Sequence, residues 1–117
     1  MAKYAITGGY TAETWAKLVQ NPEDRTGPVT KLIESIGGKL DTIFWTMGDD
    51  DYLVIFDAPD DISAAAGSVA VAGSGALRHV KTTKLLTADQ LNQVLQKAKT
   101  AAGAYSPPGS RQPAGVR

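Results

Sequence analysis

Acidic side chains are concentrated in one short stretch, Thr46–Asp61, which reads TMGDDDYLVIFDAPDD and holds six of the twelve Asp and Glu residues. Clustered carboxylates can coordinate a metal ion or act as an acid/base pair, but Asp also favours turns and helix N-termini. The calcium-loop spacing, with alternate Asp residues, a Gly and a distant Glu, is absent. We therefore expect no metal site and assign most of these carboxylates structural roles.

Asp51 is the acidic residue whose position demands more than a turn. It directly precedes Tyr52–Ala58, a strand pattern with apolar residues on both faces. A carboxylate at the start of a doubly covered strand needs a hydrogen-bond or cationic partner. Asp49 and Asp50, in contrast, fit the turn that precedes this strand.

Three further polar residues are candidates for chemistry. His79 is the only histidine, and it would form an acid/base pair with Asp51 if both lie on the open face of a sheet. The alternative is a histidine at the sheet rim without a catalytic role. Arg25 and Arg78 can each bind a carboxylate or phosphate through the guanidinium fork, or instead pair with neighbouring carboxylates such as Glu23 or Asp51.

Large aromatic residues accompany these groups. Tyr10, Trp45 and Tyr52 can line an apolar ligand pocket, or they can belong to the core or to a subunit interface. The sequence lacks both the glycine-rich nucleotide-binding patterns and a nucleophile elbow. Nucleotide binding and serine-hydrolase chemistry therefore have no support.

Composition excludes several other classes of function. The chain has 117 residues, no net charge and no cysteine. Zinc–thiolate, iron–sulfur and thiol chemistry are thereby excluded, and nothing in the charge balance favours nucleic acid or anionic lipid. No signal-peptide pattern or apolar run of membrane-spanning length is present. We expect a soluble, cytoplasmic protein without a cofactor, a nucleic-acid partner or a membrane partner.

The elements that must position these residues alternate between strand and helix patterns. Thr87 and Gln90 form a capping box, and Asp60 or Asp61 can cap the helix after Pro59. We expect strands at Lys3–Gly8, Lys39–Met47, Tyr52–Ala58 and Ala76–Leu86, and helices from Thr11 to Pro22, from Thr26 to Ile36, from Asp60 to Gly73 and from Thr87 to Gly103.

This order predicts an α+β fold, namely a ferredoxin-like βαββαβ plait with a four-stranded antiparallel sheet, a split first helix and an additional C-terminal helix. The domain is expected to span residues 1–103, and residues 104–117 are expected to form a flexible tail rich in Pro and Gly.

Oligomerisation is predicted from the strand at Tyr52–Ala58. Helices cover only one face of a ferredoxin-like sheet, yet this strand is apolar on both faces. A second subunit would cover the other face, which predicts a homodimer or a larger homo-oligomer. The alternative is that the C-terminal helix folds back over that face.

The residues also form a pattern that resembles the GYD domain family, over roughly Lys3 to Leu86. The family's Gly-x-Tyr-Asp stretch reads Gly48-Asp49-Asp50-Asp51 here, so Asp50 replaces the tyrosine, and Asp57 stands where members tend to carry Glu. The resemblance implies a ferredoxin-like domain that assembles as an oligomer, without an established activity. The landmarks are Tyr10-Thr11, Arg25, Gly37-Gly38-Lys39, Gly48-x-x-Asp51, Asp57-Ala58-Pro59-Asp60-Asp61 and Gly75-x-x-Arg78.

Three functions remain open from the sequence. The first is a homo-oligomeric module that binds a small molecule in or beside the subunit interface, with contacts from Tyr10, Arg25, Asp51 and Arg78 and an apolar wall from Trp45. The second is a cofactor-independent enzyme of the dimeric α+β barrel type that uses Asp51 and His79. The third is a structural or scaffold protein whose tail binds a partner.

Overall fold

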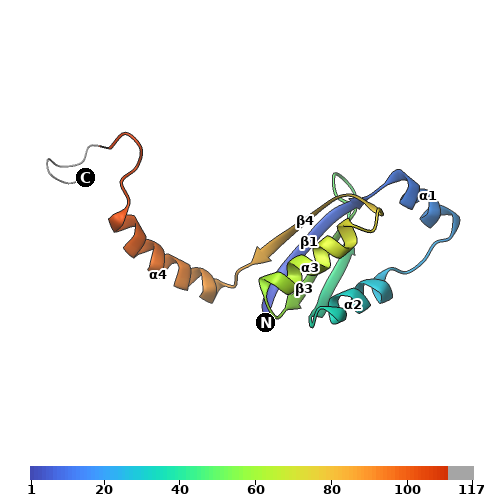
Figure 1. Cartoon of the computed structure of the whole chain (residues 1–117), viewed down its shortest axis with the longest axis horizontal. Helices are drawn as coiled ribbons and strands as arrows, with labels where there is room; N and C mark the ends of the chain where they lie inside the picture. The colour runs from blue at the N-terminus through green and yellow to red at the C-terminus, as the bar shows by residue number, and fades with distance from the viewer. Residues whose placement is uncertain (111–117) are drawn as a thin grey trace. The chain divides into compact units, whose positions relative to one another are not determined.

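The computed structural model of the chain describes residues 1–110. Four strands and four helices follow one another in the predicted order (Figure 1). Their bounds are β1 Ala2–Tyr10, α1 Ala12–Gln20, α2 Thr26–Ser35, β2 Lys39–Trp45, β3 Tyr52–Ala58, α3 Asp61–Ala72, β4 Leu77–Leu85 and α4 Ala88–Ala104.

The four strands form one antiparallel sheet in the order β2-β3-β1-β4. The first and third strands are central, as the ferredoxin-like plait requires, so the predicted fold class is confirmed. The ladder is interrupted twice. Asp41 is an extra residue in β2, and a register shift at Gly9/Tyr10 disturbs the pairing of β1 with β4.

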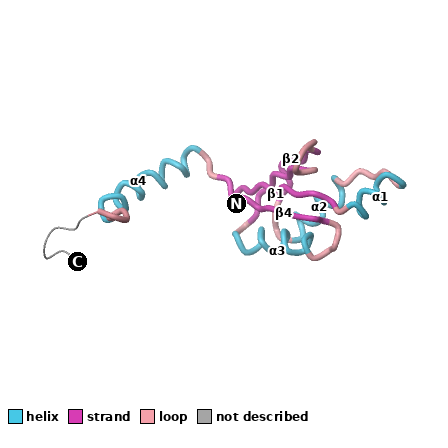
Figure 2. Tube along the Cα trace, turned by 90° about the horizontal axis from the view of Figure 1, so that it is seen from above, coloured by secondary structure: helices cyan, strands magenta, loops and turns pink. Residues whose placement is uncertain are grey.

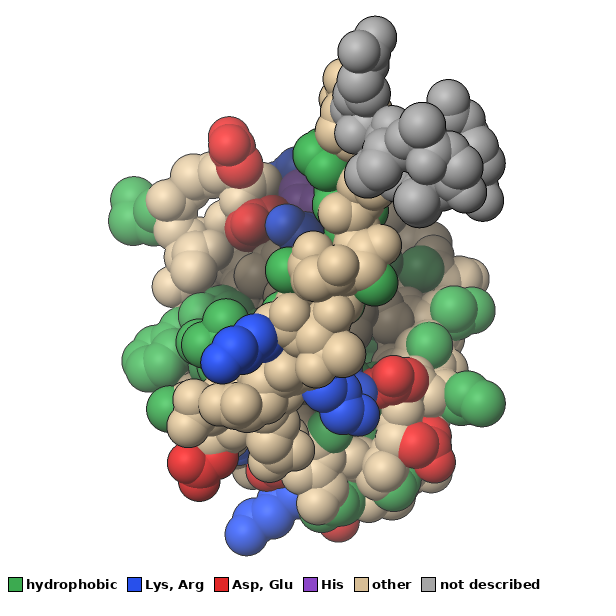
Figure 3. Space-filling view, turned by 90° about the vertical axis from the view of Figure 1, so that its left-hand side faces the viewer, with side chains coloured by type: hydrophobic (Ala, Val, Ile, Leu, Met, Phe, Trp, Pro, Cys, Tyr) green, Lys and Arg blue, Asp and Glu red, His purple; other side chains and the backbone are tan. Residues whose placement is uncertain are grey.

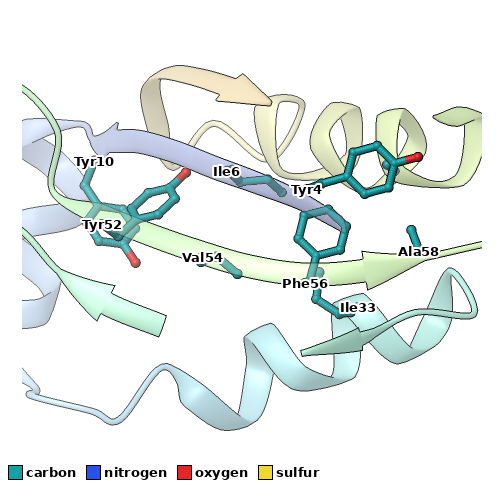
Figure 4. Packing of buried hydrophobic residues seen from close by; sticks show 9 residues of the cluster. Tyr4, Ile6, Tyr10, Ile33, Tyr52, Val54, Phe56 and Ala58 are labelled. Carbon is teal, nitrogen blue, oxygen red and sulfur yellow. The ribbon is translucent and has the colours of Figure 1, made fainter. Parts of the chain in front are cut away.

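One face of the sheet packs against helices, and α3 is seen on one side of the strands in Figure 2. Alternate residues of the central strands enter this core because successive side chains point to opposite faces. Ile33 of α2 meets them from the helix layer (Figure 4). Ala64 of α3 belongs to the same cluster. The buried hydrophobic residues are Tyr4, Ile6, Tyr10, Ile33, Tyr52, Val54, Phe56, Ala58 and Ala64.

The opposite face of the sheet, called here the open face, carries the second set of apolar residues in β3. Leu53 and Ile55 are half-buried, and the neighbouring Phe44 of β2 is exposed. Only one face of β3 is thus packed under helices of its own compact unit. Cover of the open face by a second subunit stays a prediction.

The predicted end of the first strand was wrong. The expectation placed it at Gly8, but β1 continues through both glycines to Tyr10. Gly8 is required because backbone comes very close to it, whereas the groups near Gly9 are the mobile end of one side chain. A Cβ atom on Gly8 would lie 2.7 Å from the carbonyl oxygen of His79, and one on Gly9 would lie 2.4 Å from the Arg78 guanidinium.

The helix caps follow the sequence signals. Thr11 caps α1, and Asp60 caps α3 by accepting a 2.7 Å hydrogen bond from the backbone N–H of Ser63. At the start of α4 both hydrogen bonds of the Thr87/Gln90 capping box are present.

The chain divides into two compact units, Met1–Leu85 and Leu86–Arg117. The sheet and α1–α3 make up the first unit. In the second, α4 exposes about half of the surface of Leu91, Val94 and Leu95. The predicted tail, residues 104–117, begins at the last residue of α4, and its residues 111–117 lie outside the described part of the chain. The predicted domain boundary at residue 103 stays a prediction.

Within residues 1–110, no helix is both long enough and apolar enough to cross a bilayer. Acidic and basic side chains are dispersed on the face shown in Figure 3, and neither sign collects in one patch there.

Candidate ligand-binding site

Four aromatic rings meet at one end of the helix-covered face. Tyr10 ends β1, Trp45 ends β2, Tyr52 begins β3, and Trp15 comes from α1. The ring centroid of Tyr10 lies 5.2 Å from that of Trp15, 5.8 Å from that of Tyr52 and 6.2 Å from that of Trp45. These separations are typical of aromatic contacts, so the ends of three strands share one aromatic cluster.

A cavity of about 110 Å³ lies between this cluster and the helix layer. Three of the five predicted ligand-binding residues, Tyr10, Arg25 and Trp45, line it together. Its other walls are mainly aliphatic side chains of the sheet, α2 and α3, such as Ile43 and Val71. An apolar cavity with a few polar groups is the usual form of a small-molecule site.

A second hollow, of about 260 Å³, shares Tyr10, Arg25 and Trp45 with the first. It adds Asp51 and Trp15 to the lining. Four of the five predicted residues therefore come together around two neighbouring cavities. The fifth, Arg78, lines neither of them.

Asp51 has the partners that its position demands. Its carboxylate, with 15% of the side chain exposed, accepts hydrogen bonds from the Tyr10 backbone N–H at 2.9 Å and from the Trp15 indole N–H at 3.2 Å. The Arg78 guanidinium lies 3.5 Å away and completes the set. Asp51 thus ties the start of β3 to β1 and α1 and fixes the aromatic cluster.

Arg78 reaches the β2–β3 connection from β4. It donates to the carbonyl oxygen of Asp49 at 2.8 Å and lies 2.9 Å from His79 Nδ1. A guanidinium can only donate, so Nδ1 must accept. His79 Nε2 then carries the proton and donates to Asp50 at 2.7 Å.

The expected acid/base pair of Asp51 and His79 is therefore not formed. The partner of His79 is Asp50, the residue at the position where the GYD pattern has tyrosine. Both ring nitrogens of His79 are engaged, because Nδ1 accepts from Arg78 and Nε2 donates to Asp50. In this arrangement His79 fastens the hairpin connection to β4.

The tyrosines of the site are in apolar surroundings. Burial raises the pKa of Tyr52 to about 12. Burial also raises the pKa of Tyr10, although the Arg25 guanidinium, which hydrogen-bonds its hydroxyl, acts in the opposite direction. Both phenols are therefore neutral hydrogen-bonding groups at pH 7.

The acidic stretch serves the structure. Asp50 and Asp51 hold the hairpin connection, Asp57 pairs with Lys3, and Asp60 caps α3. Hydrogen bonds from Tyr4 and Lys84 lower the pKa of Asp61. Within residues 1–110, no group of three or more His, Asp or Glu side chains is placed to hold a metal ion.

Sequence reasoning missed two contributors to this region. Trp15 was not among the candidate residues, but its indole N–H donates to Asp51 and its ring packs on Tyr10. A tryptophan just after a capped helix start, beside a polar stretch, carries a weak signal of this kind, because a partly buried indole N–H seeks an acceptor. Val71 of α3 had no signal, because its helix consists mostly of Ala, Gly, Ser and Val and marks no single lining face.

One solved structure and one family model are similar to parts of this chain. A crystal structure titled "Crystal Structure of MtbAldR (Rv2779c)" is similar over 74% of this chain, with a TM-score of 0.47 and 16% sequence identity. The matched region covers 52% of that protein, so the present chain spans about half of its length. No curated protein matches the sequence.

The sequence pattern is matched by a family as well. The GYD domain model matches residues 4–95, which is most of the chain and extends past the resemblance noted above into α4. The chain therefore belongs to the GYD domain family.

Proposed function

We propose that this GYD domain protein is a homo-oligomeric module that binds a small molecule. The observation that carries the proposal is the cavity of about 110 Å³ between the aromatic cluster and the helix layer. Its lining combines apolar walls with Tyr10, Arg25 and Trp45, three of the residues that the sequence predicts as ligand contacts. Binding sites are commonly concave and apolar, with a few polar groups that orient the ligand.

Self-association is supported by the open face. Leu53 and Ile55 are half-buried and Phe44 is exposed, so apolar groups of neighbouring strands lie side by side where no helix of Met1–Leu85 packs. A second copy would cover this strip with an identical one, as in the common two-fold dimer.

The acid/base enzyme has less support. Its base would be His79, but both ring nitrogens of His79 are hydrogen-bonded to the protein. Neither nitrogen is therefore free to accept a proton from a substrate. The scaffold function depends on the tail, half of which, residues 111–117, lies outside the described residues.

Native mass spectrometry of the full chain, as purified, tests the self-association. We expect a dimer or larger species, and we expect Leu53→Glu to shift it toward monomer because a charge on the open face opposes a buried contact. A monomeric wild-type chain would refute the self-association.

Binding is tested with small ring compounds of three charges, namely benzoate, benzamide and benzylammonium, added at millimolar concentration. We expect at least one of them to shift the tryptophan indole signals in an NMR spectrum. The chain has two tryptophans, and both lie in the aromatic cluster. The shift should be lost in Val71→Phe, which fills the cavity, and kept in Val69→Phe, because Val69 is 69% exposed on the same helix. No shift with any of the three compounds would refute the binding function.

A further inference from the structure

The cavity is lined by one charged group, and the sign of that charge restricts the charge of the ligand. Among the residues within Met1–Leu85 that line the 110 Å³ cavity, Arg25 is the only one with a charge. The other walls are apolar apart from the hydroxyls of Tyr10, Tyr52 and Ser74. Both phenols remain neutral at pH 7 because burial raises the pKa of each. A cation beside apolar walls favours a ligand with one negative charge.

The Arg25 guanidinium is held loosely by the protein. It makes a single 3.3 Å contact with Glu23, whose side chain is 52% exposed, and it hydrogen-bonds the Tyr10 hydroxyl. A guanidinium has five N–H donors in a planar fork that matches a carboxylate. Within residues 1–110, no carboxylate holds Arg25 in the bidentate manner. A ligand carboxylate can therefore take the fork and displace Glu23.

Two carboxylates line the larger hollow, and neither favours a cationic ligand. Glu23 is 52% exposed and already pairs with Arg25, and Asp51 is committed to the protein. It lines only the larger hollow, and its carboxylate already accepts from the Tyr10 N–H and the Trp15 indole and pairs with Arg78. A ligand ammonium group would have to compete with three donors. The charge available to a ligand is thus that of Arg25.

The size of the cavity restricts the rest of the ligand. A cavity of about 150 Å³ with aliphatic and aromatic walls accommodates benzene. The present cavity, at about 110 Å³, has a volume of the same order. It adjoins the larger hollow, and Arg25 lines both. It therefore suits a ring-sized or similarly compact apolar body, with the charged group at the shared boundary.

From these observations we infer that the ligand is a small monocarboxylate with a compact apolar body, whose carboxylate binds Arg25 and whose body lies between Trp45 and the aliphatic walls. This inference rests on the proposed binding function and adds the chemical class of the ligand.

Benzoate, its neutral isostere benzamide, and benzylammonium test the charge of the ligand in NMR titrations of the full-length protein. We expect benzoate to bind most tightly. Arg25→Gln should weaken benzoate binding roughly tenfold or more, because it removes charge-assisted hydrogen bonds, and should leave benzamide unchanged. Glu23→Gln should tighten benzoate binding roughly two- to fivefold, because it removes the exposed competitor for Arg25.

The two proposals fail in different ways. Equal binding of benzoate and benzamide, or tighter binding of benzylammonium, would overturn the monocarboxylate assignment and leave the binding function intact. Benzoate binding that persists in Arg25→Gln would overturn the role of Arg25. Absence of binding by all three compounds would overturn the binding function and the assignment with it. The circular dichroism spectrum of each variant confirms that it is folded.

Discussion

Replacing Asp51 with Asn is expected to destabilise the domain strongly, although the two side chains have nearly the same shape. The Asp51 carboxylate accepts from the Tyr10 N–H at 2.9 Å and from the Trp15 indole at 3.2 Å. Charge-assisted hydrogen bonds are about twice as strong as neutral ones, so neutralisation costs about 1 kcal/mol for each bond. The longer pair with the half-exposed Arg78 adds less than about 1 kcal/mol.

The expected loss in the free energy of unfolding is therefore about 2–3 kcal/mol, which corresponds to a fall in Tm of about 10–20 °C for a unit of this size. Urea denaturation followed by circular dichroism at pH 7 measures it. Asp49→Asn is the matched control, since the Asp49 side chain is exposed and only its backbone carbonyl is bonded. If Asp51→Asn is as stable as the control to within about 0.5 kcal/mol, Asp51 does not organise the site and the reasoning is refuted.

Three further outcomes are expected. Gly8→Ala should lower the free energy of unfolding by about 1–3 kcal/mol, because its Cβ would lie 2.5 Å from the Tyr52 hydroxyl and 2.7 Å from a backbone carbonyl. Gly27→Ala, with nothing within 4 Å, should be neutral or stabilising in the same urea titration. The pKa of Tyr52 is raised from 10.0 to about 12, so this phenol stabilises the fold below pH 10 and the contribution is lost as the pH rises toward 12. Tyr52→Phe should lose less stability than wild type between pH 9 and 11, and equal losses would contradict the burial argument. Asp60→Ala should lower the Tm while Asp60→Asn keeps it, because Asn also caps helices, and equal Tm values would show that the cap contributes nothing.

Much of the fold could be predicted because local signals and long-range pairing agree. The caps at Thr11 and Thr87 and the apolar strand Tyr52–Ala58 each specify their element without knowledge of the partner. The first strand was mispredicted because Gly8 and Gly9 are also the usual residues of a turn. Here Gly8 is needed for the close approach of the His79 backbone, which is about 70 residues away in sequence and leaves no local trace.

The sequence allowed us to predict which residues belong to the candidate site, but not which of them bind one another. The requirement that Asp51 have a partner followed from its place before an apolar strand, and the structure confirms it. Which carboxylate meets His79 depends on the conformation of the hairpin connection and on the register of β4. A shift of one residue exchanges Asp50 for Asp51, and no sequence pattern determines such a shift.

The two outer strands of the sheet bear on how this protein avoids aggregation. The edge of β2 is broken by the extra residue Asp41, and the edge of β4 carries Lys81 and Lys84. Bulges and lysines on an edge oppose the addition of a further strand from another molecule. Neither edge is therefore a good template for fibril growth, even in a chain that exposes apolar side chains on one sheet face. An assembly formed through that face can therefore stop at a closed oligomer, because further strands are not added at the sheet edges.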